Sequence, residues 1–187
     1  MKDNKIKIVA LFGPAGSGKD YLVKKIMNSV YTNTNKVSEI VSQTTRPPRE
    51  NEKNGIHYFF KDKDEFIKDI NEGNLLEWTS FRDWYYGTNL QSLHQDKINI
   101  GVFNIEGVRT LLKDDRIEIF PVAITTSPKT RLIRQLSREQ NPDIKEIFRR
   151  YEADEIDFSF IDFKYTIIHN EDYDNAELTL ADFVNSL

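Results

Sequence analysis

A glycine-rich turn near the start of the chain constrains its fold more than any other stretch. The sequence GPAGSGK, residues 13–19, follows a short apolar run and precedes a segment whose apolar residues recur at helical spacing. Glycines let consecutive backbone N–H groups point toward one anion, and the start of the following helix faces the same anion. A strand, this turn and a helix in succession predict a phosphate-binding loop within an α/β fold.

The loop itself supplies the predicted phosphate ligands, and its lysine would reach the β- and γ-phosphates of a nucleotide. The residues are Gly13, Pro14, Ala15, Gly16, Ser17, Gly18, Lys19 and Asp20. The general pattern ends in Ser or Thr, whose hydroxyl binds Mg²⁺, whereas this chain has Asp20. A carboxylate can bind Mg²⁺ directly or through water, but its charge can also weaken the binding of a phosphate. Asp is favoured at helix starts as well, so the sequence leaves the role of Asp20 open.

Composition and charge exclude several other classes of protein. The chain has 187 residues, a net charge of −4, no cysteine and three scattered histidines. Disulfides, thiolate catalysis and cysteine zinc sites are excluded, and the charge argues against a general binder of nucleic acids or membrane surfaces. The apolar run at the N-terminus is too short for a secretory signal, and no stretch approaches the roughly 20 apolar residues of a membrane span. We therefore expect a cytoplasmic protein that binds neither nucleic acids nor membranes.

Hydrophobic periodicity predicts strands that alternate with helices. This succession is typical of a three-layer α/β fold with a central parallel sheet. Strands are expected at 7–13, 37–43, 56–60, 117–126 and 164–170, on both sides of a turn near 82–83 within 74–88, and at the start of 98–112. Helices are expected at 19–31, 63–73, from about 106, at 127–140, 143–158 and 175–187.

Four stretches resemble the guanylate kinase family in their order and spacing, and the likeness spans nearly the whole chain. They are SQTTRPPRENEKNGIHYFF, LLEW, WYYGT and YTIIHNEDYDNA. The resemblance implies a P-loop core (1–41, 90–126 and 153–187), a small, mostly β subdomain for the nucleoside monophosphate (42–89) and a helical lid (127–152). It implies phosphorylation of GMP or dGMP by ATP, with Mg²⁺ as the cofactor and nucleotides as the partners. A monomer and a homodimer both remain open.

The resemblance also assigns residues to the acceptor nucleotide. Arginine forks match phosphate oxygens in pairs, and tyrosines assist them. A carboxylate can accept from both N1–H and the 2-amino group of guanine, a donor pair that adenine lacks. The implied residues are Arg46, Arg49, Tyr58 and Tyr86 for the phosphate, Ser42, Glu77 and Thr88 for the base, and Asn104 near the base and the metal.

The arginine-rich segment matches the family's lid. Arg134 and Arg138 are four residues apart and are expected on one helix face, with Arg149 further along the chain. The resemblance implies that these arginines close over the transferring phosphoryl group, and that Asn170 contacts adenine, chiefly through its backbone. The residues implied for catalysis are Lys19, Arg46, Arg134, Arg138 and Arg149.

Two departures from the family pattern suggest a hypothesis about charge. Family members usually have acidic residues where this chain has Val102 and Asn104, and a neutral ligand where it has Asp20. Asp20 is therefore expected to lie close to Asn104 and to replace part of its missing charge.

Three rivals to guanylate kinase activity follow from the same residues. One is a kinase with a broader range of deoxynucleoside monophosphates, since no residue identifies the ribose. A relative that phosphorylates a ribose bisphosphate should lack Ser42 and Glu77, and both are present. The last is a catalytically weak binding module, favoured by Asp20 and Asn104 but opposed by Lys19 and the lid arginines.

Overall fold

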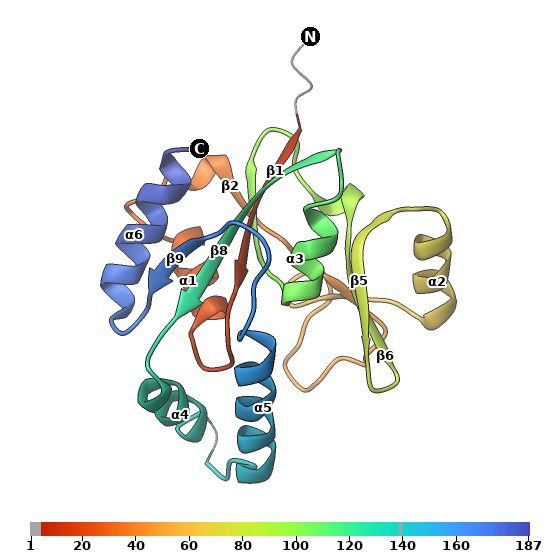
Figure 1. Ribbon diagram of the computed structural model, residues 1–187. Coiled ribbons are helices and arrows are strands. Elements are labelled where there is room, and N and C mark those ends of the chain that lie inside the picture. The colour runs from red at the N-terminus through yellow and green to blue at the C-terminus, as the bar shows by residue number, and fades with distance from the viewer. Residues whose placement is uncertain (1–4, 139) are drawn as a thin grey trace.

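The computed structural model of the chain describes residues 5–138 and 140–187. Its main sheet has five parallel strands in the order β2-β7-β1-β8-β9, with β1 in the centre (Figure 1). The strands are β1 (Ile6–Phe12), β2 (Val37–Glu39), β7 (Ile98–Val102), β8 (Ile117–Thr125) and β9 (Thr166–His169). The predicted α/β fold with a central parallel sheet is thereby confirmed.

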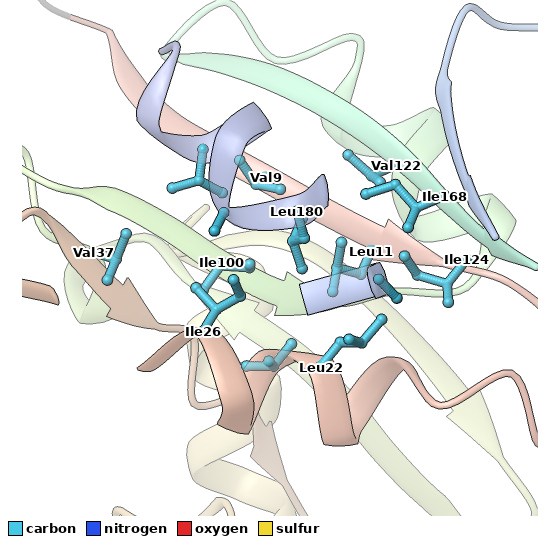
Figure 2. Close-up of a cluster of buried hydrophobic side chains, with 14 residues drawn as sticks. Val9, Leu11, Leu22, Ile26, Val37, Ile100, Val122, Ile124, Ile168 and Leu180 are labelled. Carbon is cyan, nitrogen blue, oxygen red and sulfur yellow. The ribbon is translucent and has the colours of Figure 1, made fainter. Parts of the chain in front are cut away.

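Helices cover both faces of this sheet, which is why β1 is apolar from Ile8 to Phe12. The helices α1 (Lys19–Met27) and α6 (Tyr173–Asn185) pack on one face, where Figure 2 shows Leu22, Ile26 and Leu180 against β1. The helix α3 (Ile105–Leu111) covers the other face. Alternate residues of β1 therefore belong to different clusters: Val9 and Leu11 face α1, and their neighbours face α3.

A second sheet lies beside the first, with strand order β4-β3-β6-β5 (Figure 1). Its elements are β3 (Gln43–Thr44), β4 (Phe59–Phe60), β5 (Leu75–Phe81), β6 (Trp84–Asn89) and the helix α2 (Lys63–Asn71). The turn between β5 and β6 lies where the sequence predicted it, with Arg82 at φ +56°. A short 3₁₀ helix at Leu90–Ser92 leads from β6 back to β7 of the main sheet, and another at Thr34–Lys36 precedes β2.

The second sheet corrects two predicted strands. The strand expected at 37–43 is divided, because β2 pairs with β7 in the main sheet while β3 pairs with β6 in the second. The strand expected at 56–60 is reduced to β4, since the preceding residues turn back through a bond from the Gly55 N–H to the carbonyl of Tyr58.

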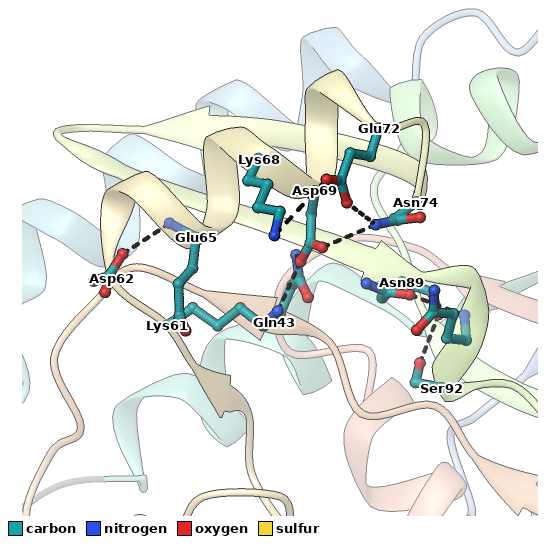
Figure 3. Close-up of polar contacts among 11 residues, drawn as sticks. Gln43, Lys61, Asp62, Glu65, Lys68, Asp69, Glu72, Asn74, Asn89 and Ser92 are labelled. Carbon is teal, nitrogen blue, oxygen red and sulfur yellow. Dashed lines mark hydrogen bonds and ion pairs between the residues drawn. The ribbon is translucent and has the colours of Figure 1, made fainter.

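A buried carboxylate joins α2 to the second sheet (Figure 3). Asp69 accepts hydrogen bonds from Lys61 Nζ at 2.7 Å, Gln43 Nε2 at 2.9 Å and Asn74 Nδ2 at 3.2 Å. Burial alone would raise the pKa of Asp69, but these donors outweigh it and hold the pKa below its usual value. A satisfied polar cluster of this kind specifies one packing of α2 on β3.

Two further helices lie beyond the carboxyl edge of the main sheet (Figure 1). They are α4 (Pro128–Leu136), whose first turn is capped by Ser127, and α5 (Ile144–Asp157), capped by Asp143. The helix predicted for 127–140 ends at Leu136, so the prediction that Arg138 shares a helix face with Arg134 is wrong. The helix α5 runs without a break through the predicted boundary at 152–153.

Candidate active site

The loop of residues 13–18 joins β1 to α1 at the carboxyl edge of the sheet. Gly16 has φ +80° and Gly18 has φ +90°, a region of backbone conformation that glycine adopts without strain. A Cβ added at Gly16 would lie 2.7 Å from the backbone oxygen of Arg131. Both the conformation and the close approach of α4 therefore require glycine here.

Lys19 begins α1 and bends back over the loop, where its Nζ donates to the carbonyl of Pro14 at 3.0 Å. Burial lowers the pKa of Lys19, and the negative charges of Asp20 and Asp154 oppose that shift. The loop thus presents a desolvated ammonium group, which attracts a phosphate more strongly than an exposed lysine would.

A cavity of about 400 Å³ opens directly over this loop, and we call it the donor cavity. It receives Arg134 and Arg138, two of the arginines that the sequence predicted, and also Arg150. Arg134 donates to the carbonyl of Asn170 at 2.9 Å and lies 4.1 Å from the ring centroid of Tyr173. The residues that line the donor cavity are Ala15, Gly16, Gly18, Lys19, Asp20, Tyr21, Arg134, Gln135, Arg138, Arg150 and Tyr173.

Asn170, which directly follows β9, is bonded to the loop. Its side chain is fully buried and donates from Nδ2 to the carbonyl of Ser17 at 2.6 Å, while its backbone N–H donates to Thr125. Its Oδ1 finds no hydrogen-bond partner among the residues that the structure describes. The side chain of Asn170 thus connects the end of β9 to the phosphate loop, while its backbone N–H connects it to β8.

A second cavity of about 360 Å³, the acceptor cavity, is lined chiefly by α1 and by residues from the segment 39–58. Ser42 and Tyr58, both predicted for the acceptor, line it. Asp20 and Arg138 line this cavity as well as the donor cavity. The two cavities therefore meet at the end of the phosphate loop.

Two of the residues predicted to bind the acceptor phosphate, Arg46 and Tyr86, lie beside a third, Tyr58. The guanidinium of Arg46 lies 5.5 Å from the ring centroid of Tyr58, and the rings of Tyr58 and Tyr86 are 6.1 Å apart. Glu52, which the sequence reasoning did not single out, pairs with Arg46 Nη2 at 2.8 Å and accepts from the backbone N–H of Arg49 at 2.8 Å. The pairing with Arg46 lowers the pKa of Glu52 to about 2. The carboxylate of Glu52 thus occupies the Arg46 guanidinium and the Arg49 N–H of this cluster.

Glu77 and Thr88 face each other across β5 and β6, where Thr88 Oγ1 donates to Glu77 Oε1 at 2.8 Å. Burial raises the pKa of Glu77, and the bonds from Thr88 only partly oppose it. The second carboxylate oxygen lies near the start of α3, because a Cβ added at Gly107 would be 3.4 Å from it. Asn104 caps this helix by accepting from the Gly107 N–H at 2.6 Å, so its side chain shapes the wall around Glu77.

Two predicted features are placed differently from expectation. Arg149 turns to Glu146, with nitrogen–oxygen distances of 2.8 and 2.9 Å, while its neighbour Arg150 enters the donor cavity. Asn104 lines a third cavity of about 350 Å³ together with Lys19 and Asp154, whereas Asp20 lines the donor and acceptor cavities. The structure therefore does not bring Asp20 and Asn104 into one cavity.

Several side chains of the site were missed in the sequence. Glu52 follows Arg49 by three residues in a loop, and no periodicity marks it. Arg150 directly follows Arg149, which the sequence analysis assigned to the lid, and the two differ only in the direction in which each side chain leaves the helix. The ring pair of Tyr21 and Tyr173, with centroids 4.3 Å apart, joins residues far apart in the chain. For these two tyrosines the sequence carried no signal.

Metal-binding groups are sparse. Within 5–138 and 140–187 no group of three or more His, Asp or Glu side chains could hold a metal ion. In the same residues no helix is both long and apolar enough to cross a membrane. Asp20 is exposed and lines both the donor and acceptor cavities, where one carboxylate could join the phosphates of a nucleotide around Mg²⁺.

The chain is similar to known proteins over nearly its whole length. The guanylate kinase family profile matches residues 5–187. A guanylate kinase of Malacoplasma penetrans (strain HF-2) is 33% identical, over 94% of this chain and 90% of its own length. One from Helicobacter hepaticus (strain ATCC 51449 / 3B1) is 33% identical over 96% and 90%. The crystal structure of guanylate kinase from Anaplasma phagocytophilum shares the fold, with a TM-score of 0.67 at 19% identity, and covers 97% of this chain and 86% of its own.

Proposed function

The chain belongs to the guanylate kinase family and phosphorylates GMP with ATP, and we propose how its cavities divide this reaction. ATP binds in the donor cavity and GMP in the acceptor cavity. The observation that carries this proposal is that Asp20 and Arg138 line both cavities. A phosphoryl group at the end of the phosphate loop would therefore lie within reach of both nucleotides.

Phosphoryl transfer depends on positioning and on neutralising charge, and needs little covalent chemistry from the protein. In the proposed arrangement the backbone of residues 13–18 and Lys19 hold the phosphates of ATP. Arg134 and Arg138 approach the transferring group from the lid side, joined by Arg150, which the structure places in the donor cavity. Arg149 can contribute only if its pairing with Glu146 is released on lid closure.

The acceptor phosphate is proposed to bind Arg46, Arg49, Tyr58 and Tyr86. Because Glu52 already pairs with Arg46, the phosphate must either displace this carboxylate or share the Arg46 guanidinium with it. A phosphate offers more charge and more acceptor oxygens than one carboxylate, so the exchange favours the nucleotide. The pair keeps the guanidinium oriented before GMP arrives.

Ser42, Glu77 and Thr88 are proposed to identify guanine. Thr88 occupies one carboxylate oxygen of Glu77, and the carboxylate retains further lone pairs for the N1–H and the 2-amino group. We propose that GMP and dGMP are both accepted, since the residues assigned to the acceptor contact the base and the phosphate. The comparisons favour neither a broader deoxynucleotide kinase nor a binding module.

Mg²⁺ is proposed to bind between Asp20 and the phosphates of ATP, where it would supply charge neutralisation for the transfer. This assigns Asp20 a supporting role in place of the usual hydroxyl. ATP and GMP are cytoplasmic metabolites, and we propose that the enzyme acts there.

A coupled assay of ADP release tests this function directly. ATP and Mg²⁺ are supplied with GMP, dGMP, AMP, CMP, UMP or dTMP in turn. We expect turnover with GMP and dGMP and little with the other four. If none of the six acceptors raised ADP release above the rate without an acceptor, the assigned activity would be wrong.

A further inference from the structure

Arg131 is a buried cation that the reaction described above does not use. It lies in the first turns of α4 with 4% of its surface exposed. Its Nη2 pairs with Asp154 of α5 at 2.7 Å, and its Nε donates to the carbonyl of Ala15 at 3.1 Å. The guanidinium also lies 4.5 Å from the ring centroid of Tyr151. A buried charge needs such compensation, and here the phosphate loop supplies part of it.

Asp154 completes a closed ring around one residue of the loop. The backbone N–H of Ala15 donates at 2.7 Å to Oδ2 of Asp154, the oxygen that also pairs with Arg131. Both polar groups of the Ala15 backbone are therefore bound by side chains of α4 and α5. Next to this ring, Gly16 packs on the backbone of Arg131. We call Arg131 and Asp154 the loop clamp.

The clamp has two geometric consequences. It holds the phosphate loop against α4 and α5, so the loop needs less reorganisation when an anion binds. It also sets the position of α5 relative to the loop. Arg150 precedes Asp154 by four residues on the same helix, so both lie on one face, and Arg150 enters the donor cavity.

We propose that Arg131 and Asp154 are positioning residues for ATP, which preform the phosphate loop and direct Arg150 into the donor cavity. The proposal rests on the donor site proposed above. It accounts for the burial of an arginine beside a loop that must itself attract anions. The negative charge of Asp154 also offsets the repulsion between Arg131 and the Lys19 ammonium group.

The opposite role for Asp154 is a placeholder that occupies a loop N–H until a phosphate replaces it. The two roles predict effects of opposite sign. Removing a positioning group weakens the binding of ATP, whereas removing a competing carboxylate strengthens it. Measuring the affinity for ATP therefore separates them.

The test compares Asp154→Asn and Arg131→Lys with a matched control, Glu155→Gln. Asn keeps the size of Asp154 and Lys keeps the charge of Arg131, so both variants should fold. Glu155 also lies near Arg131, at 3.3 Å from Nη1, but is largely exposed, and the ring around Ala15 closes through Asp154. Thermal melting without nucleotide checks the fold of each variant.

We expect the dissociation constant and the KM for ATP to rise about tenfold in Asp154→Asn and in Arg131→Lys, about 1.4 kcal/mol each. The KM for GMP at saturating ATP should stay unchanged, which a general loss of structure would not produce. The dissociation constant of the double variant for ATP should be about that of the single variant that binds ATP less tightly, because both residues act through one ring. Glu155→Gln should match the unchanged protein.

Four results overturn parts of this account. Unchanged affinity for ATP in two folded variants refutes the clamp, and tighter binding assigns Asp154 the placeholder role instead. Equal increases in the KM for ATP and for GMP indicate a structural role only. If the unchanged protein does not bind ATP at all, the proposed donor site fails before the clamp is tested.

Discussion

Glu77 offers the sharpest test of how this chain selects its acceptor. Replacing Glu77 with Gln keeps the shape of the side chain but turns one carboxylate oxygen into an amide donor. Thr88 still finds an acceptor in the remaining oxygen, so the contact at 2.8 Å can persist. The new amide group then faces the donors of guanine, and neither side of that contact is satisfied.

The size of the effect follows from the lost contact. A hydrogen bond to a charged group contributes about 1.5–3 kcal/mol, and an unpaired buried donor costs a similar amount. We therefore expect the variant to lose about 3 kcal/mol of transition-state stabilisation, so that kcat/KM for GMP falls roughly a hundredfold. The KM for ATP should be unchanged, because Glu77 does not line the donor cavity.

The pH dependence gives a second reading of the same residue. Burial raises the pKa of Glu77, so its ionised fraction falls as the pH decreases through this raised value. The KM for GMP should accordingly rise toward acidic pH in the unchanged protein and lose this dependence in Glu77→Gln. A carboxyl with a raised folded pKa favours folding below its usual pKa and loses that contribution as the pH rises. At neutral pH the variant should therefore melt no lower than the unchanged protein.

The control is Glu118→Gln, which neutralises an exposed carboxylate of β8, remote from both cavities. The assay is steady-state ADP release with GMP varied at saturating ATP, and then the reverse, between acidic and neutral pH. A Glu77→Gln protein with the kcat/KM of the control would refute the assignment of guanine recognition to this residue.

Three other outcomes follow from the structure. Leu180→Ala, in the cluster under α6, should lower the free energy of unfolding by about 2–5 kcal/mol and leave the KM for GMP unchanged, as measured by denaturant titration. Gly16→Ala should weaken ATP binding in a nucleotide titration, since its Cβ would lie 2.7 Å from the carbonyl oxygen of Arg131; tight binding would show that the loop can shift. Asp20→Ser and Asn104→Asp should have additive effects on Mg²⁺-dependent turnover, because they line different cavities. Strong coupling between the two would instead support a shared metal site.

Much of the fold could be predicted because its signals are local. The apolar run of β1, the glycines of the loop and the amphipathic α1 are consecutive in the chain, and each limits its own backbone. The divided strand at 37–43 was missed, since β2 and β3 differ in their partners and not in their local pattern. The end of α4 at Leu136 was missed because the following residues remain polar and carry no glycine or proline before Pro142.

The sequence by itself determined the phosphate loop, the alternation of strands and helices, and the order of motifs that identifies the family. Those properties depend on neighbours within one turn or one strand. Tertiary structure alone decided which charges meet: Glu52 with Arg46, Arg150 in the donor cavity instead of Arg149, and Asp154 on the N–H of Ala15, 139 residues away. The physical reason is that a charge in a folded protein is compensated by whichever group packing brings within a few ångströms, and separation along the chain does not limit that choice.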